Sequence, residues 1–199
     1  MPDIDWIDGA DLCTSVWGIL SGSVQPGNDI VIYDGSGRHP APHCAEYCAM
    51  AGKSVKLVGR DGFLAAELTY VERVSWKSKL YEKEVPTRFD HRLVRAERRD
   101  NRVVGIFVNE LTQKEIELFC DQLVVEHGTI PEDEVFQGLR AASINDGVTD
   151  IDALLAGSAQ ISSGRRQEAR FELHRIGDAV ASRNIQSAVL DAFRLCRML

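Results

Sequence analysis

Two glycines, Gly35 and Gly37, follow a short apolar run and have a spacing that could hold a phosphate. In the dinucleotide fingerprint G-x-G-x-x-G, the glycines permit a tight turn, close approach of the backbone to a pyrophosphate, and close packing of the next helix. Backbone N–H groups and the positive end of the helix hold the anion. Here Pro40 takes the third glycine position and Pro42 follows it, and proline has no N–H to donate. The loop therefore favours a Rossmann-like domain that has kept its fold and lost its ligand, with pyrophosphate binding as the alternative.

Arg60 stands at the tip of a second apolar run, over residues 54–58. An acidic residue at this point of a dinucleotide-binding unit binds the ribose hydroxyls of NAD, whereas an arginine accommodates a 2′-phosphate. Arg60 therefore favours NADPH over NADH, provided that a dinucleotide binds.

Gly177 and Asp178 form a sharp turn just ahead of a predicted helix. An acid placed there can accept a hydrogen bond from a sugar hydroxyl while the following N–H groups face a phosphate. The alternative is that Asp178 only caps the turn, and these two residues alone do not decide between the two roles.

Four side chains of types that bind zinc lie close together in sequence, namely His39, His43, Cys44 and Cys48. The two cysteines share a helical face that must also meet a sheet, so buried cysteines beside loop histidines are favoured. The five cysteines of the chain are odd in number and include no C-x-x-C pair, which is typical of small buried side chains in a reducing compartment. No G-x-S-x-G, H-E-x-x-H or phosphate-loop lysine motif occurs.

The elements that position these residues begin with a βαβ unit. Residues 30–33 form a β-branched and aromatic run, and residues 54–58 form a second such run. Both are too short for helices and the first is bounded by turns, which predicts buried parallel strands. Small residues at helical spacing between them predict a helix close against the sheet. A short helix within residues 13–22, capped by Thr14 or Ser15, is expected to pack on this unit.

The region after the second strand is predicted to be helical over residues 63–68 and 71–85. The expected inward positions are Leu64, Leu68, Val71, Val74 and Leu80. Three short segments with alternating or β-branched character then predict an antiparallel meander, with a turn at Asp100-Asn101, and residues 122–128 predict a strand that returns to the main sheet.

The last third is predicted to contain short helices, one extended segment and a closing helix. The helices are expected over 134–142 and 150–155, a loop over 157–170, a strand over 171–176 and an amphipathic helix over 184–199. Its packing residues are expected to be Ile185, Ala188, Val189, Ala192, Phe193, Leu195 and Cys196. The predicted fold class is thus α/β, with a central parallel sheet and an antiparallel β-meander.

Composition excludes some classes of partner. The 199 residues have a net charge of -7 and offer no basic face for a phosphate backbone, so nucleic acid is not expected as a partner. No apolar run approaches the ~20 residues that span a bilayer, and the first residues lack the features of a signal peptide. No membrane partner is expected, and the predicted location is cytoplasmic.

Three stretches of the chain resemble one flavoprotein family, the trimethylamine dehydrogenase and 2,4-dienoyl-CoA reductase group. They are PDIDWIDGADLCTSVWGILSG at residues 2–22, DIVIYDGSGRHPAPHCAEYCAMAGKSVKLV at 29–58, and RIGDAVASRNIQSAVLDAFRL at 175–195. Within that group the chain most resembles the dimethylglycine, stachydrine and N-methylproline demethylases. The resemblance implies a C-terminal nucleotide-binding region, preceded in the full enzymes by a β/α barrel that holds FMN and an iron–sulfur cluster.

The resemblance also implies a domain division. Residues 1–27 and 131–199 correspond to parts of a split FAD-type domain, and residues 28–130 to a Rossmann-like NAD(P)-type domain inserted in it. Gly177 and Asp178 match the family's second FAD or ADP contact, and the closing helix begins at Asn184. His127-Gly128 stands where relatives often have Thr-Gly, which further weakens the case for nucleotide binding.

Two functions remain as hypotheses. The first is the FAD/NAD(P)-type nucleotide-binding region of a flavin-dependent oxidoreductase, a fragment without turnover by itself. Its cofactors would be FAD (or ADP) and NAD(P)H, bound weakly or no longer bound. Its partners would be the flavin barrel region of the same enzyme or of a partner chain, and an electron-transfer flavoprotein. The second is a vestigial Rossmann-like scaffold or interaction domain that no longer binds nucleotide.

Overall fold

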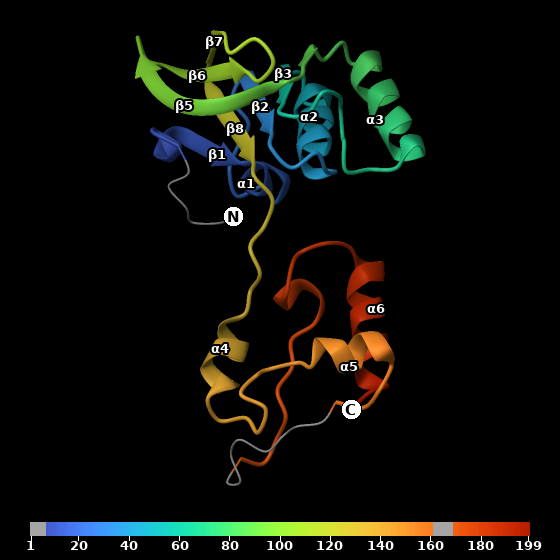
Figure 1. Cartoon of the computed structure of the whole chain (residues 1–199). Coiled ribbons are helices and arrows are strands. Elements are labelled where there is room, and N and C mark those ends of the chain that lie inside the picture. The colour runs from blue at the N-terminus through green and yellow to red at the C-terminus, as the bar shows by residue number, and fades with distance from the viewer. Residues whose placement is uncertain (1–6, 161–168) are drawn as a thin grey trace. The chain divides into compact units, whose positions relative to one another are not determined.

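The computed structural model describes residues 7–160 and 169–199. The chain divides into two compact units, Met1–Gly128 and Thr129–Leu199 (Figure 1). The assignment of residues 1–27 and 131–199 to a split FAD-type domain stays a prediction.

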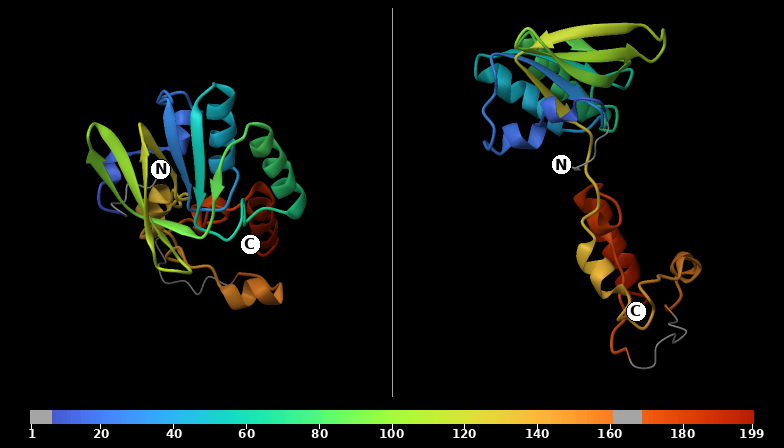
Figure 2. Two further views of the ribbon diagram at one scale, coloured as in Figure 1. Left: turned by 90° about the horizontal axis from the view of Figure 1, so that it is seen from above. Right: turned by 90° about the vertical axis from the view of Figure 1, so that its left-hand side faces the viewer.

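The first unit is built on a five-stranded parallel sheet with the order β1-β8-β2-β3-β4. The strands are β1 Cys13–Ser15, β2 Asp29–Asp34, β3 Ser54–Gly59, β4 Thr87–Arg88 and β8 Gln122–Glu126. Helices α1 Val16–Leu20, α2 Pro40–Met50 and α3 Tyr70–Glu82 contribute to the core on one face of this sheet. A second, antiparallel sheet covers the other face, formed by β5 His91–Arg99, β6 Arg102–Asn109 and β7 Glu115–Cys120 (Figure 2). The predicted α/β class, with its parallel sheet and meander, is confirmed.

Alternate residues of β2 serve two separate cores. Ile30 and Ile32 are fully buried with Cys44 and Cys48 of α2 on the helix face. Val31 and Tyr33 are buried on the meander face, where Phe107 packs against them. A strand covered on both faces needs an unbroken apolar run, which explains the pattern at residues 30–33.

Strand β2 lies at the centre of the sheet and positions the glycine loop. It pairs with β3, to which α2 leads, and with β8, which follows the meander. Asp34, the last residue of β2, is in register with Gly59 on one side and Glu126 on the other. In open α/β sheets ligands bind where connections leave the carboxyl ends of neighbouring strands in opposite directions, and this is the point where Gly35 begins.

The predicted short helix near the N-terminus, with Ser15 as its cap, is confirmed. Residues 13–15 form β1 beside β8, and α1 begins only after Ser15, whose hydroxyl accepts the N–H of Trp17 at 3.2 Å. Val16 and Ile19 are buried in the helix-side core of the first unit, as expected for a piece with no core of its own.

The helix predicted over residues 63–68 is wrong. This segment forms turns, and Ala65 has φ +53, which an α-helix does not allow. Helix α3 begins after Thr69, which forms a capping box with Glu72. Leu64 and Leu80 are buried as predicted, but Val71 is 75% exposed and Val74 is 45% exposed.

The meander and its turn are confirmed. Asp100 and Asn101 both have positive φ, 47 and 65, between β5 and β6. Two successive positive values are typical of the tight hairpin turns that match strand twist. Strand β8 then returns to the main sheet between β1 and β2, as predicted.

The second unit contains α4 Glu134–Arg140, α5 Ile151–Ala156, a 3₁₀ turn at Gly177–Ala179 and α6 Ile185–Cys196. The predicted helices are confirmed. The predicted strand over residues 171–176 is wrong, because no described residue of the second unit pairs with it as a strand. Most of the loop predicted over 157–170 lies outside the described residues, since 161–168 are not described.

Helix α6 buries less of its apolar side than expected. Of the predicted packing positions Leu195 is 4% exposed, but Ile185 is 83% exposed, Val189 61% and Phe193 57%. Cys196 is also exposed, whereas Cys44, Cys48 and Cys120 are buried. Across the described part of the chain, every helix is too short or too polar to cross a lipid bilayer.

Candidate functional site

The loop after β2 is held by the side chain of the last strand residue. One carboxylate oxygen of Asp34 accepts the backbone N–H of Gly37 at 2.8 Å and that of Ser36 at 3.2 Å. The N–H of Gly35 donates to the carbonyl oxygen of Glu126 at 2.8 Å. All three N–H groups of the Gly35–Gly37 turn therefore donate to acceptors within the chain.

Acidic groups surround this turn. Asp34 is 4% exposed, and burial raises its pKa to about 6, opposed by the two loop amides and assisted by Glu126 and Asp61. Glu126 is 3% exposed and accepts the N–H of Gly128 through both carboxylate oxygens, at 2.9 and 3.0 Å. Two neighbouring strands thus each end in a buried acid that binds the loop following it.

The start of α2 offers few donors to an anion. Pro40 and Pro42 lack N–H groups, and the N–H of His43 already donates to the carbonyl of His39. His39 makes no capping bond; its Nδ1 accepts the indole N–H of Trp76 at 3.0 Å. A helix start normally leaves four N–H groups for a phosphate, and here two of those positions are prolines.

Gly37 has a packing role in this loop. Its φ is +65, and a Cβ atom there would lie 2.7 Å from Oδ2 of Asp61. The position therefore requires glycine whether or not a phosphate approaches. With the loop amides occupied and the helix start short of donors, the residues of the first unit do not fit a bound pyrophosphate.

A cavity of about 280 Å³ lies beside the turn on the meander side, lined by Tyr33, Gly35, Arg60, Arg92 and His127 among others. The structure thus brings two predicted residues, Gly35 and Arg60, to one place, while Gly37 is not among the lining residues. Arg60 is exposed, and no carboxylate among the described residues forms an ion pair with it; Arg92 pairs with Glu110 at 2.7 Å. Burial lowers the pKa of His127 to about 4, so its imidazole is neutral at pH 7.

The second unit contains a larger groove of about 520 Å³. Its lining includes three arginines, Arg175, Arg183 and Arg194, together with Asp191. Arg175 pairs with Asp133 at 2.6 Å and Arg183 pairs with Asp191, whereas no described carboxylate pairs with Arg194. Sequence reasoning did not single out these arginines, although their density around the Gly177-Asp178 turn was a visible signal.

Two predicted site residues of the second unit, Gly177 and Asp178, stand in sequence between the lining residues Ile176 and Val180, and the third, Asn184, follows the lining residue Arg183. Gly177 is buried with φ +57, and its N–H donates to Oδ2 of Asp191 at 3.2 Å. Asp178 is exposed, and no described group bonds to its carboxylate. Asn184 caps α6 by accepting the N–H of Ser187 at 2.8 Å. Gly177 and Asn184 thus shape the turn and the helix start, whereas the carboxylate of Asp178 has no bonding partner among the described residues.

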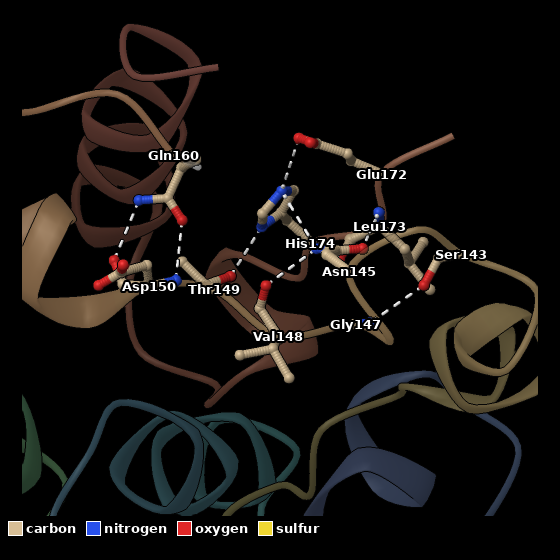
Figure 3. Close-up of polar contacts among 10 residues, drawn as sticks. All are labelled: Ser143, Asn145, Gly147, Val148, Thr149, Asp150, Gln160, Glu172, Leu173 and His174. Carbon is tan, nitrogen blue, oxygen red and sulfur yellow. Dashed lines mark hydrogen bonds and ion pairs between the residues drawn. The ribbon is translucent and has the colours of Figure 1, made fainter. Parts of the chain in front are cut away.

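A polar network replaces strand pairing for the extended segment before Gly177 (Figure 3). The side chain of Asn145 accepts the N–H of Leu173 at 2.9 Å and donates to its carbonyl at 2.8 Å, as a neighbouring strand would. His174 lies 2.8 Å from the hydroxyl of Thr149 through Nδ1. Thr149 lines the groove, so this network fixes one wall of it.

Known proteins resemble this chain both in sequence and in structure. No protein-family model matches the chain. The chain is 35% identical over 201 residues to the multifunctional alkene reductase/demethylase OYE of Caballeronia cordobensis, covering all of this chain and 30% of that protein. It is 36% identical over 189 residues to a probable N-methylproline demethylase of Rhizobium meliloti, covering 95% of this chain and 28% of that protein.

Among solved structures, histamine dehydrogenase from Rhizobium sp. 4-9 has the same fold, with a TM-score of 0.71 and 20% identity. That match covers 97% of this chain and 27% of the dehydrogenase. The chain thus spans about 30% of the length of the curated relatives. The chain belongs to the trimethylamine dehydrogenase-like family of flavin oxidoreductases and corresponds to its C-terminal nucleotide-binding region.

Proposed function

We propose that this chain is the FAD/NAD(P)-type module of an amine demethylase, amine dehydrogenase or enoate reductase, and that it has no turnover by itself. The relatives it matches are an alkene reductase/demethylase and a probable N-methylproline demethylase, each about three times as long. The reaction would take place at the FMN of the barrel, with electrons passing through the iron–sulfur cluster, and this module would supply a nucleotide contact and a packing surface.

The arginine-rich groove of the second unit carries this proposal. Guanidinium groups bind phosphate in a bidentate manner, and Arg194 has no partner among the described carboxylates. The groove adjoins the Gly177 turn, where the exposed carboxylate of Asp178 could accept a hydrogen bond from a ribose hydroxyl. These residues fit the phosphate and sugar of FAD or ADP, and the cofactor when bound would supply redox chemistry that this chain's side chains do not.

We expect the isolated chain to bind FAD weakly or not at all. A complete G-x-G-x-x-G fingerprint is absent from the 199 residues, so most contacts to the second half of the dinucleotide would have to come from elsewhere. In the first unit, which does not fit a pyrophosphate as it stands, Arg60 lines the cavity beside the glycine turn and would contact the 2′-phosphate if NADPH entered.

The exposed side of α6 supports a partner of the kind predicted from sequence. Ile185, Val189 and Phe193 recur every four residues, lie on one helical face, and are between 57% and 83% exposed. The flavin barrel part of the enzyme, in the same polypeptide or in a partner chain, would cover this face. An electron-transfer flavoprotein would be a further partner of the assembled enzyme.

The alternative function, a vestigial scaffold, is favoured by one observation. The amides of the glycine turn in the first unit are bound by Asp34 and Glu126 within the chain. Under this alternative both units would serve only to pack against the flavin barrel.

Calorimetry and absorbance separate the two functions. The purified chain is titrated with FAD, ADP, NADH and NADPH, and its flavin absorbance is recorded after purification. Binding of ADP or FAD in the micromolar to millimolar range, lost in Arg194→Ala, supports the nucleotide module. If none of the four ligands gives a binding signal up to millimolar concentration, the result supports the scaffold. Flavin retained at a near-stoichiometric level, or turnover by the chain alone, would contradict the proposal of an incomplete site.

A further inference from the structure

We infer that the Asp34 carboxylate acts as a built-in substitute for a ligand phosphate, occupying the amides of the glycine turn and excluding pyrophosphate-containing nucleotides from the first unit. This inference rests on the proposed function only in taking the unit as one of nucleotide-binding type. It concerns the Gly35–Gly37 turn, not the arginine groove of the second unit.

The N–H groups of the glycine turn already have acceptors within the chain. Ser36 and Gly37 direct their N–H groups to one oxygen of Asp34, at 3.2 and 2.8 Å, and Gly35 directs its N–H to the Glu126 carbonyl. Hydrogen bonds to an ionised acceptor are about twice as strong as neutral ones. An incoming phosphate would therefore have to replace an acceptor of its own kind that is covalently attached to the turn.

A carboxylate displaced from the turn amides would remain buried beside other acidic groups. Asp34 is 4% exposed, and its neighbours across the sheet end include Glu126, which is also buried. Asp61 approaches the turn from the loop after β3, within 2.7 Å of the Cβ position of Gly37. A pyrophosphate placed here would meet three acidic groups, two of them buried, without the helix-start donors that Pro40 and Pro42 lack.

The position of Asp34 at the end of β2 suits it to bind the turn amides. Asp34 directly precedes Gly35, so its side chain reaches the amides two and three residues ahead without distorting β2, which stays in register with β3 and β8 through Asp34. The turn is therefore folded around an anion that the chain itself supplies. Removal of that anion should leave a turn able to accept another.

The test replaces Asp34 in the full chain and titrates inorganic pyrophosphate, ADP and NADPH by calorimetry at pH 7.5. Asp34→Asn keeps the shape and an oxygen acceptor but removes the charge, and Asp34→Ser also frees space. We expect no detectable pyrophosphate binding by the first unit of the wild type. Asp34→Asn should bind pyrophosphate at least tenfold more tightly than this detection limit, and Asp34→Ser should bind it more tightly still.

Two matched variants serve as controls. Asp61→Asn removes the same charge from the neighbourhood while Asp34 keeps the turn amides, so pyrophosphate affinity should change less than about threefold, as for a screened nearby charge. Pro42→Ala restores one N–H at the start of α2 and should stay silent while Asp34 is present. In every variant Arg194→Ala is added in parallel, so that binding in the second unit is subtracted.

Several outcomes would overturn the inference. One is a folded Asp34→Ser chain that, like the wild type, gives no signal of pyrophosphate binding. Another is an Asp61→Asn chain that gains as much affinity as Asp34→Asn, which would indicate general repulsion in place of occupancy. If neither Asp34 variant folds, amide NMR of the wild type decides: shifts of Ser36 and Gly37 that saturate with submillimolar pyrophosphate would contradict the inference, and unchanged shifts at 10 mM would support it. Retained flavin or turnover would instead bear on the proposed function alone.

Discussion

Gly177 and Ala188 are in close contact: a Cβ atom on Gly177 would lie 3.0 Å from the Cβ atom of Ala188 in α6. Gly177 also has φ +57, a conformation that favours glycine. The turn ahead of the closing helix therefore depends on glycine for two separate reasons, its backbone conformation and the space that α6 leaves.

Gly177→Ala should lower the free energy of unfolding of the second unit by about 2–3 kcal/mol, because alanine would have to adopt a left-handed conformation and its Cβ atom would also clash with α6. Gly177→Val should cost more, because a β-branched side chain tolerates positive φ poorly. All tryptophans and tyrosines lie in residues 1–128, so far-UV circular dichroism is the suitable probe.

Gly157→Ala is the matched control for this turn. Gly157 has a similar φ of +67, but a Cβ there would meet nothing within 4 Å. Gly157→Ala should therefore lower the free energy of unfolding by only about 1 kcal/mol, because it has the conformational cost without the steric clash. Equal losses in the two variants would remove the contact with Ala188 from the explanation.

Asp34→Asn should stabilise the first unit at neutral pH. The folded pKa of Asp34 is about 6, above its ordinary value of 3.8, so the favourable contribution of the acid is complete below pH 3.8 and is lost as pH rises through 6. The free energy of unfolding of the variant should therefore exceed that of the wild type by about 1–3 kcal/mol at pH 7.5, and the two values should approach each other at pH 4. Urea unfolding followed by tryptophan fluorescence checks this. A difference that stays constant with pH would contradict it.

Arg60→Ala should weaken NADPH binding selectively. In a chain carrying Asp34→Asn, where we expect nucleotide to enter the first unit, loss of a charged contact to the 2′-phosphate should lower NADPH affinity about tenfold and leave NADH affinity nearly unchanged. Lys53→Ala removes the same charge just before the start of β3 and serves as the control in calorimetry. Equal losses for the two dinucleotides would exclude the proposed role of Arg60.

Two residues of α6 should differ sharply in their effect on stability. Leu195→Ala, at 4% exposure, should lower the free energy of unfolding of the second unit by about 2–4 kcal/mol. Val189→Ala, at 61% exposure, should change it by less than about 0.5 kcal/mol. Melting followed at 222 nm compares them. A large loss in Val189→Ala would show that the exposed side of α6 is already covered within the isolated chain.

Much of the fold could be predicted from the sequence because the patterns that indicate its elements lie within short segments. The apolar run at 30–33, the Asp100-Asn101 turn and the small residues of α2 each predict their element from neighbours in sequence. The capping box of Thr69 and Glu72 was equally visible and would have placed the start of α3 correctly. Strand β1 has only three residues and shows no periodic pattern, so its pairing with β8 could not be predicted from the sequence.

The segment 171–176 shows where a real pattern gave a wrong prediction. Its extended character is present, but a strand also needs a neighbour, and Asn145 supplies the hydrogen bonds with its side chain instead. Similarly, the apolar spacing of α6 was correct, while most of that face is exposed in the described chain.

The sequence by itself determined the order of elements, the two glycines of the turn, the prolines that shorten its donor set, and the family, because each depends on residue type and short spacing. Only the tertiary structure decided which acceptors the turn amides bind and which arginines share a groove. Those outcomes depend on the pairing of β2 with β8, which buries Asp34 beside Glu126, and on the packing of α6 against the Gly177 turn. Contacts between residues distant in sequence form only when the whole unit folds, so no local pattern records them.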